Sequence, residues 1–477
     1  MKSKMLRVLL LLTLALSALD PGTVARAAPV WTVTDTSDTN DGVCAAQCSL
    51  REAVGLAANG DSVVFAPGVT GTITLTGSSI DIGTSITITG PGISQLTIDG
   101  NNASRIFNVL YSSITASISG MTITQGSASA YGGAINNIGI LNIDSVNFTN
   151  NHAQGNFHNG GAIHNGNTLT IHNSSFSANS ADYSGGAIES YFGTTLTITN
   201  TVFDNNQALG TISAPYSQGG AIMVSSSTAP VNQQSHFSLD HVIIKNNVAT
   251  SLGGGGSNSD GGGVFIQDSA TVTVSNSVIS GNSLTGSAAT SGGGIIIGNG
   301  GSATFNNVTI SGNFATGNSN GGGIFNNSTI NMNNVTVANN TATTPNGFGG
   351  GIQQQGGGVL NIKNSIIANN TAANGNDCYM NGTFNSQGNN LVQDTSSCNI
   401  SGNTSGNITG VDPNLGPLSD HGGNTLVQPL LSGSPAINAG NNSTCNTTDQ
   451  RGIIRGAHCD IGAYELIYQL FLPLILR

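Results

Sequence analysis

The chain is poor in charged and aromatic side chains. Of its 477 residues, 7% are charged and 5% are aromatic, whereas about 25% of an ordinary soluble domain is charged. Exposed helices depend on strong helix formers and on charged pairs one turn apart, so this shortage argues against a helical protein. The chain is instead rich in Gly, Ser, Thr, Asn, Ile and Val, which favour strands and turns. Hydrophobic residues make up 37%, enough for a packed core rather than a disordered chain.

Long apolar runs are also missing, and a transmembrane helix needs about 20 such residues. Residues 1–27 carry early basic residues, an apolar run over 8–18 and a small-x-small triplet at 25–27, the pattern of a secretory signal peptide. Its removal takes four of 11 basic and one of 22 acidic residues, leaving a net charge of −14. We expect an exported chain, secreted or at the cell surface, with no nucleic-acid partner and no transmembrane span when mature. The oligomeric state is not indicated.

Six cysteines fall into three pairs that are close in sequence. An even number in an exported chain predicts disulfides, although six cysteines allow 15 connectivities and nearest-neighbour pairing is a guess from proximity. A zinc site is the alternative, but it would need clustered ligands, and His152, His158, His164 and His172 lie far from the cysteines in sequence. The pairs are Cys44 with Cys48, Cys378 with Cys398, and Cys445 with Cys459.

An internal repeat fills the middle of the chain. Eight segments follow the template apolar-x-apolar-x-N-x-x-apolar-x-x-N, and each is preceded by a pair of glycines. An earlier polar column, from Ser145 to Asn364, is Asn in six of the eight copies. The final column is Asn in every copy: Asn151, Asn179, Asn206, Asn247, Asn282, Asn313, Asn340 and Asn370.

The template predicts a stacked solenoid. Two apolar residues spaced by two indicate one face of a strand, and Asn tolerates the left-handed backbone of a corner. A unit of about 30 residues cannot bury its apolar face alone but can do so by stacking on its neighbours. Coils would be separated by about 4.8 Å, so the eight Asn residues of the final column should form a side-chain amide ladder. We predict a structural role for them.

The repeat resembles that of polymorphic outer-membrane proteins. The Gly-Gly-Ala-Ile starts and the FxxN elements at 148–151, 176–179 and 203–206 carry this resemblance, which covers about half of the chain. More broadly, the repeat is similar to the pectin-lyase-like superfamily. That resemblance implies an all-β, right-handed parallel β-helix, and it specifies fold better than activity.

The N-terminal region reads as a cap. Ser49 and Glu52 form a capping-box pattern at the start of a short apolar stripe, which predicts a helix laid over the first coil. The segment resembles the CSLREA domain family, and Arg51 and Glu52 are expected to serve cap electrostatics. A calcium site is an alternative, although its spacing misses the EF-hand pattern; its residues would be Asp35, Asp38, Asn40 and Asp41.

The C-terminal region carries four short motifs, at 417–425, 434–440, 449–452 and 459–465. Together they resemble the choice-of-anchor Q domain of secreted bacterial β-helix proteins. Asp420 with His421, and Asp449 with Arg451, invite a catalytic interpretation. No nucleophile accompanies them, so we expect structural hydrogen bonding and predict no catalytic, cofactor or metal residue.

These patterns divide the chain into six parts. They are a signal peptide (1–27), an N-terminal cap (28–60), first coils (61–128), repeated coils (129–375), a choice-of-anchor Q-like region (376–465) and an apolar tail (466–477).

Two functions compete. An adhesion or glycan-contacting protein would use the variable loops, which are expected at one edge of the solenoid. Aromatic residues in or near those loops could stack on sugar rings: Tyr183, Tyr191, Phe192, Tyr216, Phe314 and Phe348.

The alternative is a carbohydrate-active enzyme, either a polysaccharide lyase or a glycosidase. A lyase would need acidic residues that hold calcium beside one of the few basic side chains, Arg105, Lys245 or Lys363. A glycosidase would need two carboxylates at a fixed separation. Candidate acids are Asp182, Glu189, Asp204, Asp240, Asp260 and Asp268. We favour the non-catalytic function.

Overall fold

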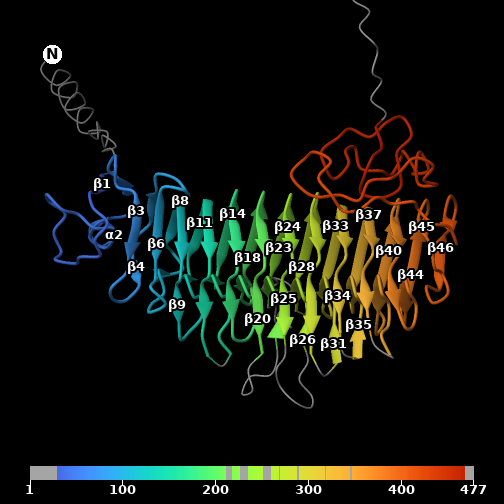
Figure 1. Ribbon diagram of the computed structural model, residues 1–477, viewed down its shortest axis with the longest axis horizontal. Helices are drawn as coiled ribbons and strands as arrows, with labels where there is room; N and C mark the ends of the chain where they lie inside the picture. The colour runs from blue at the N-terminus through green and yellow to red at the C-terminus, as the bar shows by residue number, and fades with distance from the viewer. Residues whose placement is uncertain are drawn as a thin grey trace, which may run out of the picture.

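The computed structural model describes residues 29–467 except 156, 211–216, 226–234, 251–258, 268, 287–288, 317 and 344–345. The expected signal peptide and residues 468–477 of the expected tail lie outside that part. Every pairing between the described strands of the four sheets is parallel, and strands pair with strands of the neighbouring coils, as β11 does with β8 and β14. Figure 1 shows the resulting elongated stack. The fold is a right-handed parallel β-helix with a short capping helix, as predicted.

One coil illustrates the path of the chain. After Gly132 and Gly133 come β10 (Ile135–Asn137), a tight turn, the long strand β11 (Ile140–Thr149) and the short strand β12 (His152–Ala153). A loop of variable length then leads to the next glycine pair. The insertions therefore leave the stack at the corner between the nine-stranded and eleven-stranded sheets.

The described strands form four sheets. The largest contains β1 (Val30–Val33), β2 (Ser62–Phe65), β3 (Gly71–Thr74), β5 (Ile86–Thr89), β6 (Leu96–Asp99), β8 (Thr115–Thr124), β11, β14 (Thr168–His172), β15 (Ser175–Ser177), β18 (Thr195–Thr199), β19 (Val202–Asp204), β23 (His236–Asp240), β24 (Ile243–Lys245), β28 (Thr271–Ser275), β29 (Val278–Ser280), β33 (Ser302–Ser311), β37 (Thr329–Ala338), β40 (Val359–Lys363), β41 (Ile366–Ala368), β44 (Thr383–Gln387), β45 (Leu391–Val392), β46 (Ile400–Asn403) and β47 (Ile408–Thr409). The eleven-stranded sheet contains β4 (Ile80–Ile82), β7 (Phe107–Val109), β10, β13 (Ile163–Asn165), β17 (Ile188–Ser190), β22 (Ile222–Val224), β27 (Val264–Ile266), β32 (Ile295–Ile297), β36 (Ile324–Asn326), β39 (Ile352–Gln354) and β43 (Cys378–Met380). The nine-stranded sheet contains β9 (Ser127–Ala128), β12, β16 (Ser180–Ala181), β20 (Gln207–Leu209), β25 (Val248–Thr250), β30 (Ser283–Thr285), β34 (Phe314–Ala315), β38 (Thr341–Ala342) and β42 (Thr371–Ala372), and a four-stranded sheet contains β21 (Ser217–Gln218), β26 (Ser259–Asp260), β31 (Ala289–Ser291) and β35 (Asn318–Asn320).

Two columns of left-handed residues bend each coil. The earlier polar column of the repeat, from Ser145 to Asn364, has φ between 48° and 55° in all eight copies. The second column consists of the residue before each ladder Asn, such as Asn150 and Asn205, with φ between 52° and 67°. The ladder Asn residues therefore do not themselves take the left-handed backbone. Their neighbours make the turn, so the ladder side chains can point inward.

The final Asn column forms a continuous amide ladder inside the stack. Each Nδ2 donates to the Oδ1 of the next Asn at 2.9 or 3.0 Å, from Asn151 through to Asn370. Each Nδ2 also donates to a backbone carbonyl of the preceding coil, as in the bond from Asn313 to Ile279 O at 2.9 Å. The side chains are at most 6% exposed. Burial costs little here because every polar atom has a partner.

The ladder ends on a carboxylate. Asn370 donates to Asp377 Oδ1 from both its backbone N–H and its side-chain Nδ2. The other oxygen of Asp377 accepts the backbone N–H of Asp394 at 2.7 Å. Burial raises the pKa of Asp377 from 3.8 to about 6. The sequence pattern does not reveal this end, because Asp377 lies outside the repeat template.

Apolar residues stack above one another beside the ladder. The rings of Phe148, Phe176 and Phe203 are nearly parallel, with centroids 4.6 and 4.7 Å apart. Later coils place Ile or Val at the same level, including Ile244 and Ile279. The ring spacing matches the strand spacing of about 4.8 Å, so identical residues repeat at the distance that close packing requires.

A helix covers the N-terminal end of the core. In α2 (Leu50–Leu56), Ser49 Oγ accepts the backbone N–H of Glu52, and Glu52 accepts the backbone N–H of Ser49 at 2.9 Å. Arg51 binds both oxygens of Asp38 and the carbonyl oxygens of Ser78 and Ser79. Arg51 therefore ties the helix to the first coils.

The segment from Val411 to Ile467, called here the C-terminal segment, returns over the later coils. Figure 1 shows it as an irregular red chain above the strands β33 to β45. It buries Val427, Leu430 and Ile461 against Ile366 and Leu391. Disulfides join Cys44 to Cys48 in the cap, Cys378 to Cys398 in the last coils, and Cys445 to Cys459 within this segment.

Removing one rung should destabilise the stack. Asn313→Ala leaves the side-chain and backbone N–H groups of Asn282 without their acceptor, and we expect a loss of about 3 kcal/mol of unfolding free energy. Urea denaturation measures the loss. Asn142→Ala is the matched control, because that half-buried side chain makes one bond of 3.4 Å. Equal midpoints for the two variants would contradict a stabilising ladder.

Stability should fall as the pH rises from 4 to 7. An unfolded Asp has a pKa near 3.9, whereas the pKa of folded Asp377 is raised to about 6. The folded chain thus holds its proton more tightly, and this contribution is complete below about pH 4 and is lost as the pH passes 6. We expect about 3 kcal/mol from this group, read from thermal unfolding at each pH. Asp377→Asn should flatten the profile; an unchanged slope would rule out Asp377 as its source.

Candidate functional site

The C-terminal candidates form a structural network. Asp449 accepts three bonds from Arg451, through its backbone N–H, Nε and Nη2. The guanidinium carbon of Arg451 also lies 3.9 Å from the centre of the Tyr464 ring. His421 contacts the edge of the same ring, while the neighbouring Asp420 bonds the backbone N–H of Gly422. Arg451 and Asp449 therefore neutralise each other inside the segment, which supports a structural role for the pair.

The same segment holds a second buried ion pair. Arg455 donates to Glu465 Oε2 at 3.1 Å, and both side chains are at most 5% exposed. Glu465 also accepts backbone N–H groups from Gly456 and Asp460. Burial is the largest cause of a lowered pKa for Arg455 and raises the pKa of Asp460 to about 6. Buried charges with this many partners hold a loop in place.

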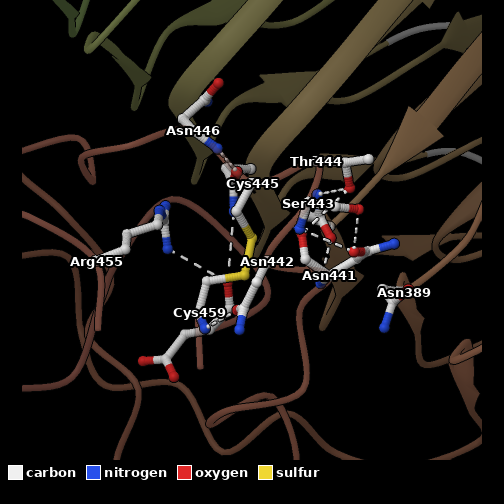
Figure 2. Close-up of a disulfide and its surroundings, with 12 residues drawn as sticks. Asn389, Asn441, Asn442, Ser443, Thr444, Cys445, Asn446, Arg455 and Cys459 are labelled. Carbon is white, nitrogen blue, oxygen red and sulfur yellow. Dashed lines mark hydrogen bonds between the residues drawn. A yellow bond between two sulfur atoms is a disulfide. The ribbon is translucent and has the colours of Figure 1, made fainter. Parts of the chain in front are cut away.

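The disulfide between Cys445 and Cys459 joins two stretches of the C-terminal segment. In Figure 2, Cys445 and Cys459 stand between Arg455 and the run Asn441 to Thr444. Asn442 Oδ1 accepts the backbone N–H of Cys459 at 2.7 Å. The cysteine pair therefore fixes the loop that carries the polar contacts to the coils.

The basic residues of the coils are also engaged. Arg105 donates to the carbonyl oxygens of Gly132 and Tyr131, and thus supports the start of the next coil. Lys245 pairs with Asp204 at 3.3 Å, and both side chains are about one-third exposed. Lys363 lines a separate depression with Asn331, Asn361 and Gln387. Within the described residues, the printed contacts of Arg105 are to carbonyl oxygens, and Lys245 pairs with a single carboxylate.

Three of the candidate acids contact a histidine, and one of them also accepts a backbone N–H group. Asp182 contacts His152 at 2.8 Å and accepts the N–H of Gly155, which fixes a loop. Glu189 contacts His164, and Asp240 contacts His241. Burial raises the pKa of Asp260 to about 6. Asp268 lies outside the described residues.

The aspartates of the calcium alternative accept hydrogen bonds from other groups of the protein. Asp38 binds Arg51 and the backbone N–H of Thr76, while Asp35 and Asp41 accept local N–H groups. Across the described part of the chain, no group of three His, Cys, Asp or Glu residues has a geometry suited to a metal ion. No described helix has the length and apolarity needed to cross a membrane.

Aromatic side chains gather across the eleven-stranded sheet of the early coils: Tyr131 and Tyr183 precede the glycine pairs, whereas Tyr191 and Phe192 lie in the turn between β17 and β18 and not in the variable loops. Tyr131 stacks on His164 at 4.9 Å and meets the edge of His158 at 5.8 Å. His164 also lies 6.1 Å from Tyr191, which contacts Phe192. We call this group the aromatic edge; its members are Tyr131, Phe157, His158, His164, Tyr183, Tyr191 and Phe192.

The aromatic edge is open to solvent and polar at its centre. Tyr131, Phe157, Tyr191 and Phe192 are each at least 40% exposed. Beneath them, His164 bonds to the buried carboxylate of Glu189. Exposed rings beside hydrogen-bonding groups suit a ligand with both apolar and polar faces, because aromatic rings contribute area and the polar groups fix orientation.

The sequence reasoning found part of this edge. It selected Tyr183, Tyr191 and Phe192 but missed Tyr131 and Phe157, although both stand within three residues of a glycine pair. Their position just before a glycine pair is the sequence signal that could have identified Tyr131 and Phe157. The other three aromatic candidates do not belong to this group. Phe314 lies on β34, and the Phe348 ring lies 4.7 Å from the Tyr379 ring in later coils. Tyr216 lies outside the described residues.

Comparisons with known proteins add little beyond the fold. No model of a protein family matches the chain, and no curated protein matches it. A solved pectate lyase, Pel9A, is 14% identical over 92% of this chain and 96% of its own, with a TM-score of 0.43. A rhamnogalacturonan lyase is 12% identical over 84% of this chain and 96% of its own, with a TM-score of 0.37. The fold assignment above rests on the strand pairing itself, which defines a parallel β-helix.

Breaking the Arg451 pair should loosen the C-terminal segment. Arg451→Ala leaves the buried carboxylate of Asp449 without its cation, which costs about 3–5 kcal/mol. We expect limited proteolysis to remove the segment while the coils stay intact. His421→Ala, at a neighbouring exposed position, is the control. Resistance of the Arg451 variant equal to that of the native chain would argue against this anchoring role.

Proposed function

We propose that the protein is an exported, non-catalytic β-helix that contacts glycans or cell surfaces through the aromatic edge. The observation that carries the proposal is the grouping of exposed rings around the His164–Glu189 pair. Sugar rings present apolar C–H faces and polar edges, and aromatic side chains stack on the former. The rigid coils below would hold the rings in place without ordering cost on binding.

Export is part of the same proposal. Three disulfides in the described residues are typical of oxidising compartments, and residues 1–27 have the pattern of a signal peptide. We further propose that residues 28–60 are a CSLREA-like cap and that 376–465 form a choice-of-anchor Q-like region. The capping box of α2 and the docked C-terminal segment support these two roles.

Glycoside hydrolysis is a second candidate, favoured by one pair of acids. Asp377 and Asp394 line the same depression, of about 360 Å³. Burial raises the pKa of Asp377 to about 6, while bonds from Ser396 lower the pKa of Asp394. Two carboxyls with separated pKa values are the arrangement of an acid and a base. Against this, both oxygens of Asp377 already accept bonds from Asn370 and Asp394.

The aromatic edge can be tested by binding. We expect Tyr191→Ala with Phe192→Ala to weaken retention of the mature chain on immobilised glycans at least 10-fold, since an aromatic stacking contact contributes about 1 kcal/mol or more. Phe314→Ala, which removes an exposed ring from another sheet, should leave retention unchanged. Equal retention of all three proteins would contradict the proposal. Shortened polysaccharide products that disappear in Asp394→Asn would favour the enzyme instead.

A further inference from the structure

A groove runs along the outer face of the early coils, away from the aromatic edge. Its volume is about 450 Å³, within the range of about 300–1,000 Å³ that is usual for ligand sites. It follows the left-handed corner between consecutive strands of a coil, such as β14 and β15. We call it the asparagine groove; it is lined mainly by Asn147, Asn173, Ser175, Asn200, His241 and Asn424.

The groove offers amide and hydroxyl groups at successive coils. Asn173 Nδ2 donates to Asp144 at 2.8 Å, and Asn200 Nδ2 donates to Asn173 at 3.4 Å. Asn173 and Asn200 are exposed, so their remaining donors and acceptors face solvent. No Lys, Arg, Asp or Glu is among the described residues that line it. Its lining is therefore mainly polar, and two carboxylates lie at its border, since Asp144 accepts from Asn173 and Asp240 contacts His241.

The same column already binds a polar chain further along. At the later coils, Asn446 donates its backbone N–H to Asn334 Oδ1 at 2.9 Å and its side-chain Nδ2 to Asn307 Oδ1 at 3.0 Å. Asn441 donates likewise to Asn364. These three acceptors are the equivalents of Asn173 and Asn200 in the repeat. The C-terminal segment thus occupies this column at the later coils, and Asn424, 3.3 Å from Asn200, marks where its cover ends.

We propose that the asparagine groove binds an extended neutral glycan. This inference rests on the proposed glycan contact and specifies the ligand class and a second surface. The length of one sugar in an extended chain is close to the coil spacing of about 4.8 Å, so hydroxyls of successive sugars would meet successive Asn side chains. Val202 and Ile243, half-buried in the same groove, supply apolar contact for the ring faces.

Charge argues against an acidic glycan. The mature chain carries a net charge of −14, which repels polyuronates. Of the described basic residues, Arg51, Lys245, Arg451 and Arg455 pair with the chain's own carboxylates. A neutral polymer would not be repelled by this net negative charge.

A peptide is the competing occupant. The docked C-terminal segment relies on apolar anchors, because Val427, Leu430 and Ile461 pack on Ile366 and Leu391. In the column that leads to Ile366 and Leu391, the groove presents Asn147 and Ser175 followed by Val202 and Ile243. A sugar chain, which carries both hydroxyl groups and apolar ring faces, matches this mixture better than a row of apolar side chains.

The test uses glycine at left-handed positions. Asn173 and Asn200 have φ of 49° and 48°, so Asn173→Gly with Asn200→Gly removes both amides without backbone strain. The matched control is Asn150→Gly with Asn205→Gly, at φ 52° and 61° on the opposite corner. Binding of the mature chain to mixed-linkage glucan, xylan, galactomannan, pectate, alginate and a synthetic peptide of residues 438–448 is measured by calorimetry.

We expect binding of at least one neutral polymer, a 10-fold or greater loss in the groove variant, and no change in the control. Val202→Lys, which fills the groove, should reproduce the loss, while Thr197→Lys on β18 should not. Binding of pectate, alginate or the peptide alone would overturn the inference. Neutral binding that survives the groove variants but falls with Tyr191→Ala and Phe192→Ala would overturn the groove and keep the proposed function. Absence of all glycan binding would overturn both.

Discussion

The buried amide ladder is the interaction on which the rest of the structure depends. A parallel stack of short strands must turn at every coil, and each turn brings backbone polar groups into the core. One Asn per coil satisfies them, because its side chain both accepts from the coil before it and donates to the coil after it. Since each rung needs the next, the coils are locked at a single spacing, and the Phe and Ile columns pack at that spacing.

A regular stack creates two requirements at its ends. The first coil exposes core that α2 covers, and the last rung needs an acceptor that Asp377 supplies. The C-terminal segment then protects the outer face of the later coils with buried ion pairs and a disulfide. As a result, the outer faces differ along the stack: the early coils keep their amide corners and loop aromatics open, whereas the later coils are covered.

Much of this could be predicted from the chain. The register of eight repeats predicted the solenoid, and the capping-box pattern predicted the helix over the first coil. The sequence reasoning recognised polar corners but did not separate the two Asn columns, since one turns the backbone and the other points inward. Asp377 escaped notice because it lies seven residues past the last repeat, and Tyr131 because a single ring before a glycine pair has no pattern of its own.

The sequence by itself determined the coil, since the spacing of apolar residues, glycine pairs and Asn residues is a local property that repeats. Only the tertiary structure decided which groups meet across coils. Stacking residues about 30 positions apart brought Tyr131 onto His164 and His164 onto Glu189. The return of the C-terminal segment placed Asn446 on Asn307 and Asn424 on Asn200, and it left Asn173 open. Such contacts join residues that are far apart in sequence. A local sequence pattern does not specify which of these residues meet.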